Sequence, residues 1–172
     1  NGPYQGITGG GRFKDDASNM MCQQPPWGQL TAVDVNTGEF AWRVPLGVTD
    51  SLPPEKQKTG RPGNGGTIAT AGGLVFVGAT DDARFRAFDA KTGKPHYQLQ
   101  RLDGLSEVFA SPVGAAGRVY LTGRDGTTLV IRNGGSFDVL AKNVLDDGFD
   151  ASPALVDSEM YMRGYRHLYS IG

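Results

Sequence analysis

The sequence predicts an all-β chain of short antiparallel strands, and three observations support this fold class. Glycine and proline are abundant, at 26 and 10 of the 172 residues, which is typical of a chain with many tight turns. Short runs rich in β-branched and aromatic residues recur between these turns, as expected for strands. No stretch keeps the apolar periodicity of a helix over about ten or more positions,.

The composition narrows the possible function classes. Hydrophobic residues make up 38% and charged residues 20% of the chain, so it can bury a core and disorder is a poor fit. The formal net charge of -1 argues against a strongly basic nucleic-acid-binding domain. No apolar run is long enough to span a bilayer, and no signal-peptide pattern is present,. The single cysteine excludes an internal disulfide, and a first residue other than methionine favours a processed or truncated chain,.

Two segments share a motif that ends in a large aromatic ring. Gly28–Trp42 and Phe85–Tyr97 both contain Ala-x-Asp-x-x-Thr-Gly-[Glu/Lys]-x-x-aromatic, and their aspartates, Asp34 and Asp89, are 55 positions apart. Thr-Gly is a turn signal in which glycine supplies a positive φ. We therefore expect each segment to form two antiparallel strands, the second of which places its ring between neighbouring sheets.

Further strands are expected between and after these segments. Leu74–Val77 and Arg118–Thr122 are short β-prone runs, and each follows a turn that contains glycine,. Asp125-Gly126 then predicts a turn into another strand at Thr127–Ile131,.

A second repeat gives the period of the chain. Ala-Ser-Pro occurs at 110–112 and 151–153, 41 positions apart, and a strand–turn–strand pattern follows each copy. Thr67–Gly78 has the same outline about 43 residues upstream. A period of about 40–45 residues with four short strands per unit indicates the blade of a β-propeller. We therefore expect one β-propeller domain over 1–172, partial or small, with about four four-stranded antiparallel blades of which the first and last are incomplete.

The repeat resembles that of the pyrroloquinoline quinone (PQQ) enzymes, the eight-bladed quinoprotein dehydrogenases. Residues 22–93 contain Cys-Gln-Gln-Pro-Pro-Trp-Gly, Trp-Arg-Val-Pro-Leu-Gly and Thr-Ala-Gly-Gly-Leu-Val-Phe-Val-Gly in order. They resemble the C-terminal blades of membrane-bound quinoprotein glucose dehydrogenases. Residues 108–171, with Phe-Ala-Ser-Pro-Val and Asp-Gly-Phe-Asp-Ala-Ser-Pro, resemble non-catalytic PQQ-like propellers, a group that includes outer-membrane assembly scaffolds. A junction between the two repeat types is expected near 95–107. The chain would either close by itself, with an N-terminal strand completing the last blade, or form half of an eight-bladed ring with a second chain.

The resemblance to the dehydrogenases implies a site on the propeller axis. It would hold PQQ with Ca²⁺ or Mg²⁺, and an aspartate base would lie near the substrate hydroxyl. No metal ligand or base of that family can be matched to this sequence, so the catalytic residues stay unknown and no metal site is predicted. Arg61 and Asn64 precede an expected innermost strand and could bond PQQ oxygens, or could simply form a polar turn. Trp27 could stack on the quinone or wedge between blades.

The aspartates have simpler interpretations. Asp34 and Asp89 recur at the same place in their segments, so we expect them to cap turns by accepting backbone N–H bonds. The pairs at 81–82 and 146–147 lack the ligand spacing of a calcium loop,. We expect these four carboxylates to be solvated in turns.

The sequence therefore favours a non-catalytic PQQ-like propeller module that serves as a binding or assembly scaffold. We expect it to be completed by self-association, as a homodimer, or by another protein partner. The alternative is a fragment or compact relative of a PQQ-dependent sugar or alcohol dehydrogenase, that is, a quinoprotein oxidoreductase. A lectin-like binder has no residue pattern in its favour. By resemblance alone, the protein would work in the bacterial periplasm.

Overall fold

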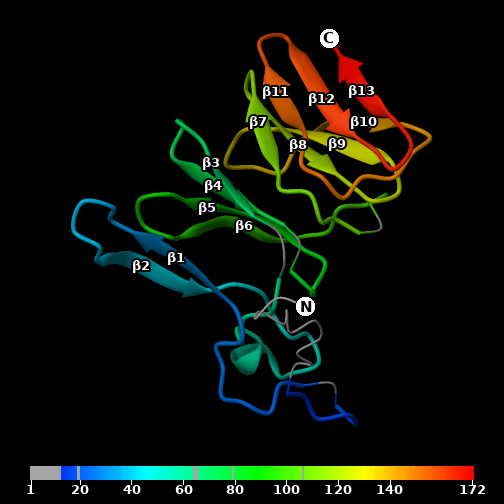
Figure 1. Ribbon diagram of the computed structural model, residues 1–172. Coiled ribbons are helices and arrows are strands. Elements are labelled where there is room, and N and C mark those ends of the chain that lie inside the picture. The colour runs from blue at the N-terminus through cyan, green and yellow to red at the C-terminus, as the bar shows by residue number, and fades with distance from the viewer. Residues whose placement is uncertain (1–12, 19, 64–65, 79, 106) are drawn as a thin grey trace, which may run out of the picture.

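The computed structural model describes residues 13–18, 20–63, 66–78, 80–105 and 107–172 (Figure 1). Over these residues the chain forms thirteen strands in four antiparallel sheets and one short 3₁₀ helix, η1 (Pro54–Lys56). Each sheet is built from strands that are consecutive in the chain. The all-β, blade-like repeat predicted from the sequence is therefore confirmed. Within the described ranges, no helix is long and apolar enough to cross a membrane.

Two of the sheets have four strands each. The second sheet consists of β3 (Thr67–Ala69), β4 (Leu74–Val77), β5 (Phe85–Asp89) and β6 (Pro95–Gln100). The third sheet consists of β7 (Val113–Ala115), β8 (Arg118–Thr122), β9 (Thr127–Arg132) and β10 (Val139–Val144). The β-prone runs of the sequence thus become the second and third strands of these sheets, as expected.

The first and last sheets have fewer strands among the described residues. The first sheet consists of β1 (Gln29–Val33) and β2 (Phe40–Pro45), which the shared motif aligns with β5 and β6. The terminal sheet consists of β11 (Ala154–Val156), β12 (Glu159–Arg163) and β13 (Leu168–Ile171). Figure 1 shows these two sheets at opposite ends of the row of four.

The hydrophobic core lies between the second and third sheets. Phe76 and Phe85 are fully buried, and their stacked rings have centroids 6.0 Å apart. Val119, Leu121 and Ile131 of the third sheet belong to the same buried cluster. Side chains alternate between the two faces of a strand, so each sheet can present one apolar face to its neighbour, as successive propeller blades do.

The repeated Ala-Ser-Pro segments lie against each other in space. The backbone N–H of Ser111 donates to the hydroxyl oxygen of Ser152 at 2.8 Å, although the two residues are 41 positions apart in the chain. The first strands of the third and terminal sheets, β7 and β11, are also in contact. The sequence repeat is therefore a spatial repeat, with the first strand of the third sheet next to the first strand of the terminal sheet.

Large rings on the outer strands fill the gaps between sheets. Trp42 on β2 donates its indole N–H to the Ala90 carbonyl at 2.9 Å, and its ring lies over Gly93, where an added Cβ would be only 2.7 Å away. Tyr97 on β6 fills the next gap, with its ring centroid 5.8 Å from that of Phe137. The predicted role of both rings between neighbouring sheets is confirmed.

Candidate functional site

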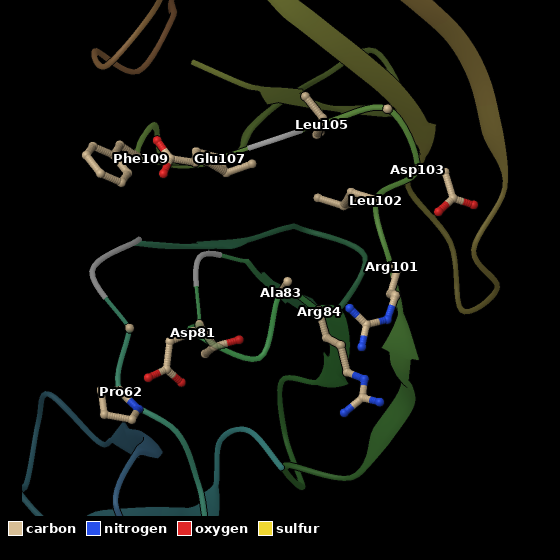
Figure 2. Close-up of a pocket in the computed structure, with 14 residues that line it drawn as sticks. Pro62, Asp81, Ala83, Arg84, Arg101, Leu102, Asp103, Leu105, Glu107 and Phe109 are labelled. Carbon is tan, nitrogen blue, oxygen red and sulfur yellow. The ribbon is translucent and has the colours of Figure 1, made fainter. Parts of the chain in front are cut away.

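A cavity of about 660 Å³ opens between the second and third sheets (Figure 2). Residues from three loops line it: 62–63 before β3, 80–84 between β4 and β5, and 101–109 between β6 and β7. A β-bridge between Gly63 and Thr80 holds the first two loops together. Consecutive antiparallel strands bring such loops to the same end of each sheet, and we call this end the loop face.

Two arginines lie together on one side of this cavity (Figure 2). The Arg84 side chain is only 12% exposed, and its Nη1 donates to Asp50 Oδ1 at 3.1 Å. Arg101 is exposed, and its Nη2 lies 3.9 Å from the other carboxylate oxygen of Asp50. The Arg84 Nε is buried and has no hydrogen-bond partner in the described part of the chain. An unmatched buried N–H has a cost in free energy.

The acidic side chains on the other side of the cavity are paired with arginines. Arg61 Nε donates to Asp81 Oδ1 at 2.7 Å. Arg124 donates from Nη1 to Glu107 Oε2 at 2.7 Å and from Nε to Asp150 Oδ1 at 2.6 Å. Each bond joins a loop before a first strand to a loop between the second and third strands of a sheet. Arg124–Asp150 therefore joins the third sheet to the terminal sheet, whereas Arg61–Asp81 and Arg124–Glu107 each brace the loops of one sheet.

Arg124 also holds an aromatic ring at the edge of the cavity. Its guanidinium carbon lies 4.5 Å from the ring centroid of Phe109, a cation–π distance. The hydrogen bonds that Arg124 donates to Glu107, Tyr165 and Asp150 raise its pKa further above its usual range. The cation is therefore permanent, and Phe109 presents a half-exposed ring face to the cavity.

A buried ion pair anchors the loop between β4 and β5. The side chains of Arg86 and Asp82 are 2% and 4% exposed and are bonded to each other. Thr80 donates its hydroxyl to Asp82 at 2.6 Å, and the backbone N–H of Val48 donates to Asp82 at 2.9 Å. Burial opposes ionisation of Asp82, but the bonds from Arg86 and Thr80 outweigh it and hold its pKa below the usual range,.

The expectation that the carboxylates at 81–82 are solvated is therefore wrong for Asp82. Arg86 occupies β5 between the core residues Phe85 and Ala87. A buried guanidinium needs a counter-charge, and Asp82, four positions earlier, supplies it. A charged residue inside an apolar strand was the sequence signal for this pair.

A second buried carboxylate, Asp147, anchors the terminal sheet. It accepts backbone N–H bonds from Arg166 and His167 at 3.1 and 3.0 Å and lies 3.3 Å from the Tyr169 hydroxyl. Burial opposes its ionisation, but the backbone N–H groups of Gly148, Arg166 and His167 outweigh this and lower the pKa of Asp147 to about 2,. Its side chain is 1% exposed, so the expectation of a solvated carboxylate is wrong here too. The Arg166 and His167 donors come from the β12–β13 loop, and no local spacing in the sequence reveals their contact with Asp147.

Trp27 and Arg61, two of the three residues predicted to contact a cofactor, lie on neighbouring segments. The backbone N–H of Trp27 donates to the Thr59 carbonyl at 2.7 Å, two residues before Arg61. The indole N–H of Trp27 is bonded to a nearby backbone carbonyl, and the Arg61 guanidinium is bonded to Asp81. Asn64 lies outside the described residues. Contact of these three residues with a cofactor stays a prediction.

The turn aspartates behave as predicted. Asp89 Oδ1 accepts the backbone N–H of Thr92 at 2.8 Å, and Asp34 Oδ1 accepts that of Asn36 at 2.8 Å. Across the described ranges, no three His, Cys, Asp or Glu side chains gather in a group that could hold a metal ion.

Comparison with protein families matches residues 8–111 to the PQQ β-propeller domain of glucose, ethanol and alcohol dehydrogenases. This match covers more than half of the chain and includes the first and second sheets. It ends at residue 111, just before β7.

Curated relatives share substantial identity with parts of the chain. Quinoprotein glucose dehydrogenase A of Acinetobacter calcoaceticus is 47% identical over 86 residues, which are 47% of this chain and 11% of that protein. The quinate/shikimate dehydrogenase (quinone) of Acinetobacter baylyi is 35% identical over 127 residues, which are 69% of this chain and 14% of that protein. A glycerol dehydrogenase large subunit of Gluconobacter thailandicus is 42% identical over 89 residues, covering 48% and 12%. The chain thus spans only a small part of the length of these relatives.

Solved structures share the arrangement of strands at low identity. BamB from Moraxella catarrhalis aligns with a TM-score of 0.59 and 21% identity over 84% of this chain and 40% of that chain. The computationally designed Ika4 protein aligns with a TM-score of 0.55 and 16% identity over 84% and 81% of the two chains. At such identities the likeness shows the fold alone.

Proposed function

The chain belongs to the PQQ β-propeller domain family of the glucose, ethanol and alcohol dehydrogenases, and on that premise we propose that it is a non-catalytic propeller module. Its role is binding or assembly, and another chain completes the ring. The observation that supports this most directly is the pairing of charges on the loop face. Arg61–Asp81 and Arg124–Glu107 brace the loops of the second and third sheets, and Arg124–Asp150 joins the third sheet to the terminal sheet, so these side chains hold the module together.

The residues of the described ranges do not fit a PQQ–metal centre by themselves. The Arg61 guanidinium is occupied by Asp81, and no cluster of metal ligands is found in those ranges. A Lewis acid on the quinone needs carboxylate and amide oxygens around it. We therefore derive no catalytic step from this chain.

A second candidate function is a segment of a PQQ-dependent dehydrogenase acting on sugars or alcohols. Identities of 42–47% to proteins named as glycerol and glucose dehydrogenases favour it. In this candidate further blades complete the axial site, and Arg61, Asn64 and Trp27 contact the cofactor. The unmatched N–H of Arg84 would then find an acceptor on an anionic ligand.

Titration with PQQ and Ca²⁺ or Mg²⁺, both of the purified chain and of the chain joined to the further blades that the second candidate requires, separates the two candidates. Binding is followed by quinone absorbance, and turnover by bleaching of a redox dye with glucose, glycerol, quinate and ethanol as substrates. The non-catalytic module gives no dye reduction with any of the four. Saturable PQQ binding followed by substrate-dependent bleaching of the dye would contradict the non-catalytic role and support the dehydrogenase.

We also propose that the chain self-associates and works in the periplasm. Self-association is supported by the two- and three-stranded end sheets of the described chain, which leave apolar side chains such as Phe40 (63% exposed) and Leu168 (72% exposed) at the surface,. The periplasmic location rests on the family resemblance, and cell fractionation with an antibody to the chain tests it.

A further inference from the structure

Asp81 lies in the shared wall of two cavities on the loop face. It lines the cavity of about 660 Å³ between the second and third sheets (Figure 2). It also lines a second cavity of about 350 Å³, whose walls are mainly polar and include residues 48–51 of the β2–β3 connection. Arg101 lines both cavities, and Arg61 lines the smaller one. One carboxylate and two guanidiniums therefore border the same space.

The Asp81 carboxylate is bonded to Arg61. Arg61 Nε donates to Asp81 Oδ1 at 2.7 Å, and the two side chains are 15% and 28% exposed. A charge-assisted bond of this length is about twice as strong as a bond between neutral groups. A carboxylate that enters from outside must therefore compete with Asp81 for the Arg61 guanidinium, and Asp81 repels it as well.

The other two arginines of these walls share a single carboxylate. Arg84 Nη1 and Arg101 Nη2 lie 3.1 and 3.9 Å from the two oxygens of Asp50. In these ion pairs, three guanidiniums are thus matched by the carboxylates of Asp50 and Asp81. Without the charge of Asp81, one carboxylate would face three guanidiniums, and the walls would attract anions.

The neighbouring acidic side chains do not alter this balance. Asp82 also lines the smaller cavity, but it is paired with the buried Arg86. Glu107 lines the larger cavity, but it is bonded to Arg124. Asp81 is therefore the carboxylate on which the availability of Arg61 depends.

The two loops that carry Arg61 and Asp81 are also joined through their backbones. The N–H of Asp81 donates to the Pro62 carbonyl at 2.9 Å, and the β-bridge between Gly63 and Thr80 lies next to this bond. An asparagine at position 81 keeps the size of the side chain, and its amide oxygen can still accept from Arg61 Nε. Asp81→Asn therefore removes the charge and leaves the loops in place.

We propose that Asp81 is a specificity-determining residue that excludes carboxylate ligands from Arg61 and from the two cavities. The excluded class is that of ligands with several carboxylates, to which PQQ, a tricarboxylate, belongs. The inference rests on the proposed non-catalytic role and supplies a physical reason for it. Asp81 provides, from within the chain, the negative charge that a ligand would otherwise bring to Arg61.

Equilibrium dialysis of the purified chain against PQQ, measured by quinone absorbance, tests this role. We expect Asp81→Asn to bind PQQ at least about tenfold more tightly than the parent chain, because a ligand carboxylate gains a charge-assisted bond and loses a repulsion. The gain should shrink as salt is added. The trimethyl ester of PQQ keeps the rings without the carboxylate charges, and it should bind the parent chain and the variant equally.

Two further variants assign the gain to the ion pair. Asp103→Asn also removes one negative charge from the wall of the larger cavity, but Asp103 is not the carboxylate bonded to Arg61, so PQQ binding should stay close to that of the parent chain. Asp81→Asn combined with Arg61→Gln should return to the weak binding of the parent chain. Each variant must keep the urea midpoint of the parent chain within error, and Asp81→Ser replaces Asp81→Asn if the latter does not.

Three results would overturn this role of Asp81. The first is equal PQQ binding by Asp81→Asn and the parent chain, the second is an equal gain in Asp103→Asn, and the third is a gain that persists after Arg61→Gln. All three leave the proposed function standing, because that function is decided by dye reduction. Dye reduction by the parent sequence, alone or joined to further blades, would contradict the non-catalytic role whatever the Asp81 variants bind.

Discussion

Replacement of Arg86 by methionine removes one partner of the most deeply buried ion pair described in the chain. The side chains of Arg86 and Asp82 are 2% and 4% exposed, so the remaining carboxylate would be left buried with a negative charge. Breaking such a pair costs about 3–5 kcal/mol. Thr80 and Val48 still donate to Asp82, so we expect the lower end, about 3 kcal/mol. For a chain of this size that corresponds to a loss of about 6–12 °C in Tm.

Urea unfolding followed by tryptophan fluorescence measures this cost. The control is Arg132→Met, because Arg132 and Asp138 form an ion pair at 2.8 Å with side chains 59% and 46% exposed. An exposed pair contributes about 0.2–1 kcal/mol, so the control should lose no more than that. The double variant Asp82→Asn with Arg86→Met should lose less than the sum of the single variants, because no unpaired charge remains buried.

The pH dependence of stability provides a second test of the Arg86–Asp82 ion pair. The pKa of Asp82 is lowered in the folded chain, so its stabilisation is present above the ordinary aspartate pKa and is lost as the pH falls below it. The stability difference between the parent chain and Arg86→Met should therefore shrink in acid. A loss below about 1 kcal/mol for Arg86→Met at neutral pH, equal to that of Arg132→Met, would refute the argument.

Three further predictions follow from single contacts. In urea unfolding, Tyr97→Phe should be neutral or stabilising by up to about 1 kcal/mol. The reason is that the Tyr97 hydroxyl has no partner among the described residues and that burial raises its pKa. A loss of stability above about 1 kcal/mol would show that the hydroxyl is bonded. Gly28→Ala should cost about 1–3 kcal/mol of unfolding free energy, since its Cβ would lie 2.2 Å from the Arg61 carbonyl oxygen. The control Gly134→Ala meets nothing within 4 Å and should leave stability unchanged. Equal losses would show that Gly28 and Arg61 do not approach each other closely. Asp147→Asn should lower the urea midpoint by a constant amount above about pH 5 and by less between about pH 4 and pH 2, because the pKa of Asp147 is lowered to about 2; a pH-independent difference would count against the carboxylate's role.

Much of the fold was predictable because turn residues and aromatic residues recur at fixed positions of the sequence repeat. Gly38 and Gly93 adopt positive φ angles of 76° and 69°, as the Thr-Gly turns require. Trp42 and Tyr97 lie between sheets, as the motif indicated. These features depend on local spacing, which the sequence displays directly.

The polar contacts of the loop face were not predictable in the same way. Asp147 is stabilised by backbone N–H groups about 20 residues away, and backbone donors carry no sequence signature. Asp82 is buried and not solvated because its partner, Arg86, lies between core residues of β5, which the Asp81-Asp82 pair alone does not reveal. The pairing of Arg61 with Asp81 depends on two loops meeting in space, which spacing along the chain does not give.

The cavity of about 580 Å³ between the third and terminal sheets could not be predicted from the sequence either. Ala141 occupies the position of Trp42 and Tyr97 only after a bulge in the β9–β10 register is taken into account. The motif that aligns the other two outer strands lacks its aspartate and Thr-Gly turn at 132–138. Strand pairing in the structure was needed to align the three.

The mass of the purified chain in solution, measured by light scattering, tests most directly whether a second chain completes the propeller. We expect a species of about twice 18.3 kDa, in which the end sheets of two chains cover each other. A single stable species of 18.3 kDa at all concentrations would contradict self-association, because the end sheets would then persist without a partner chain.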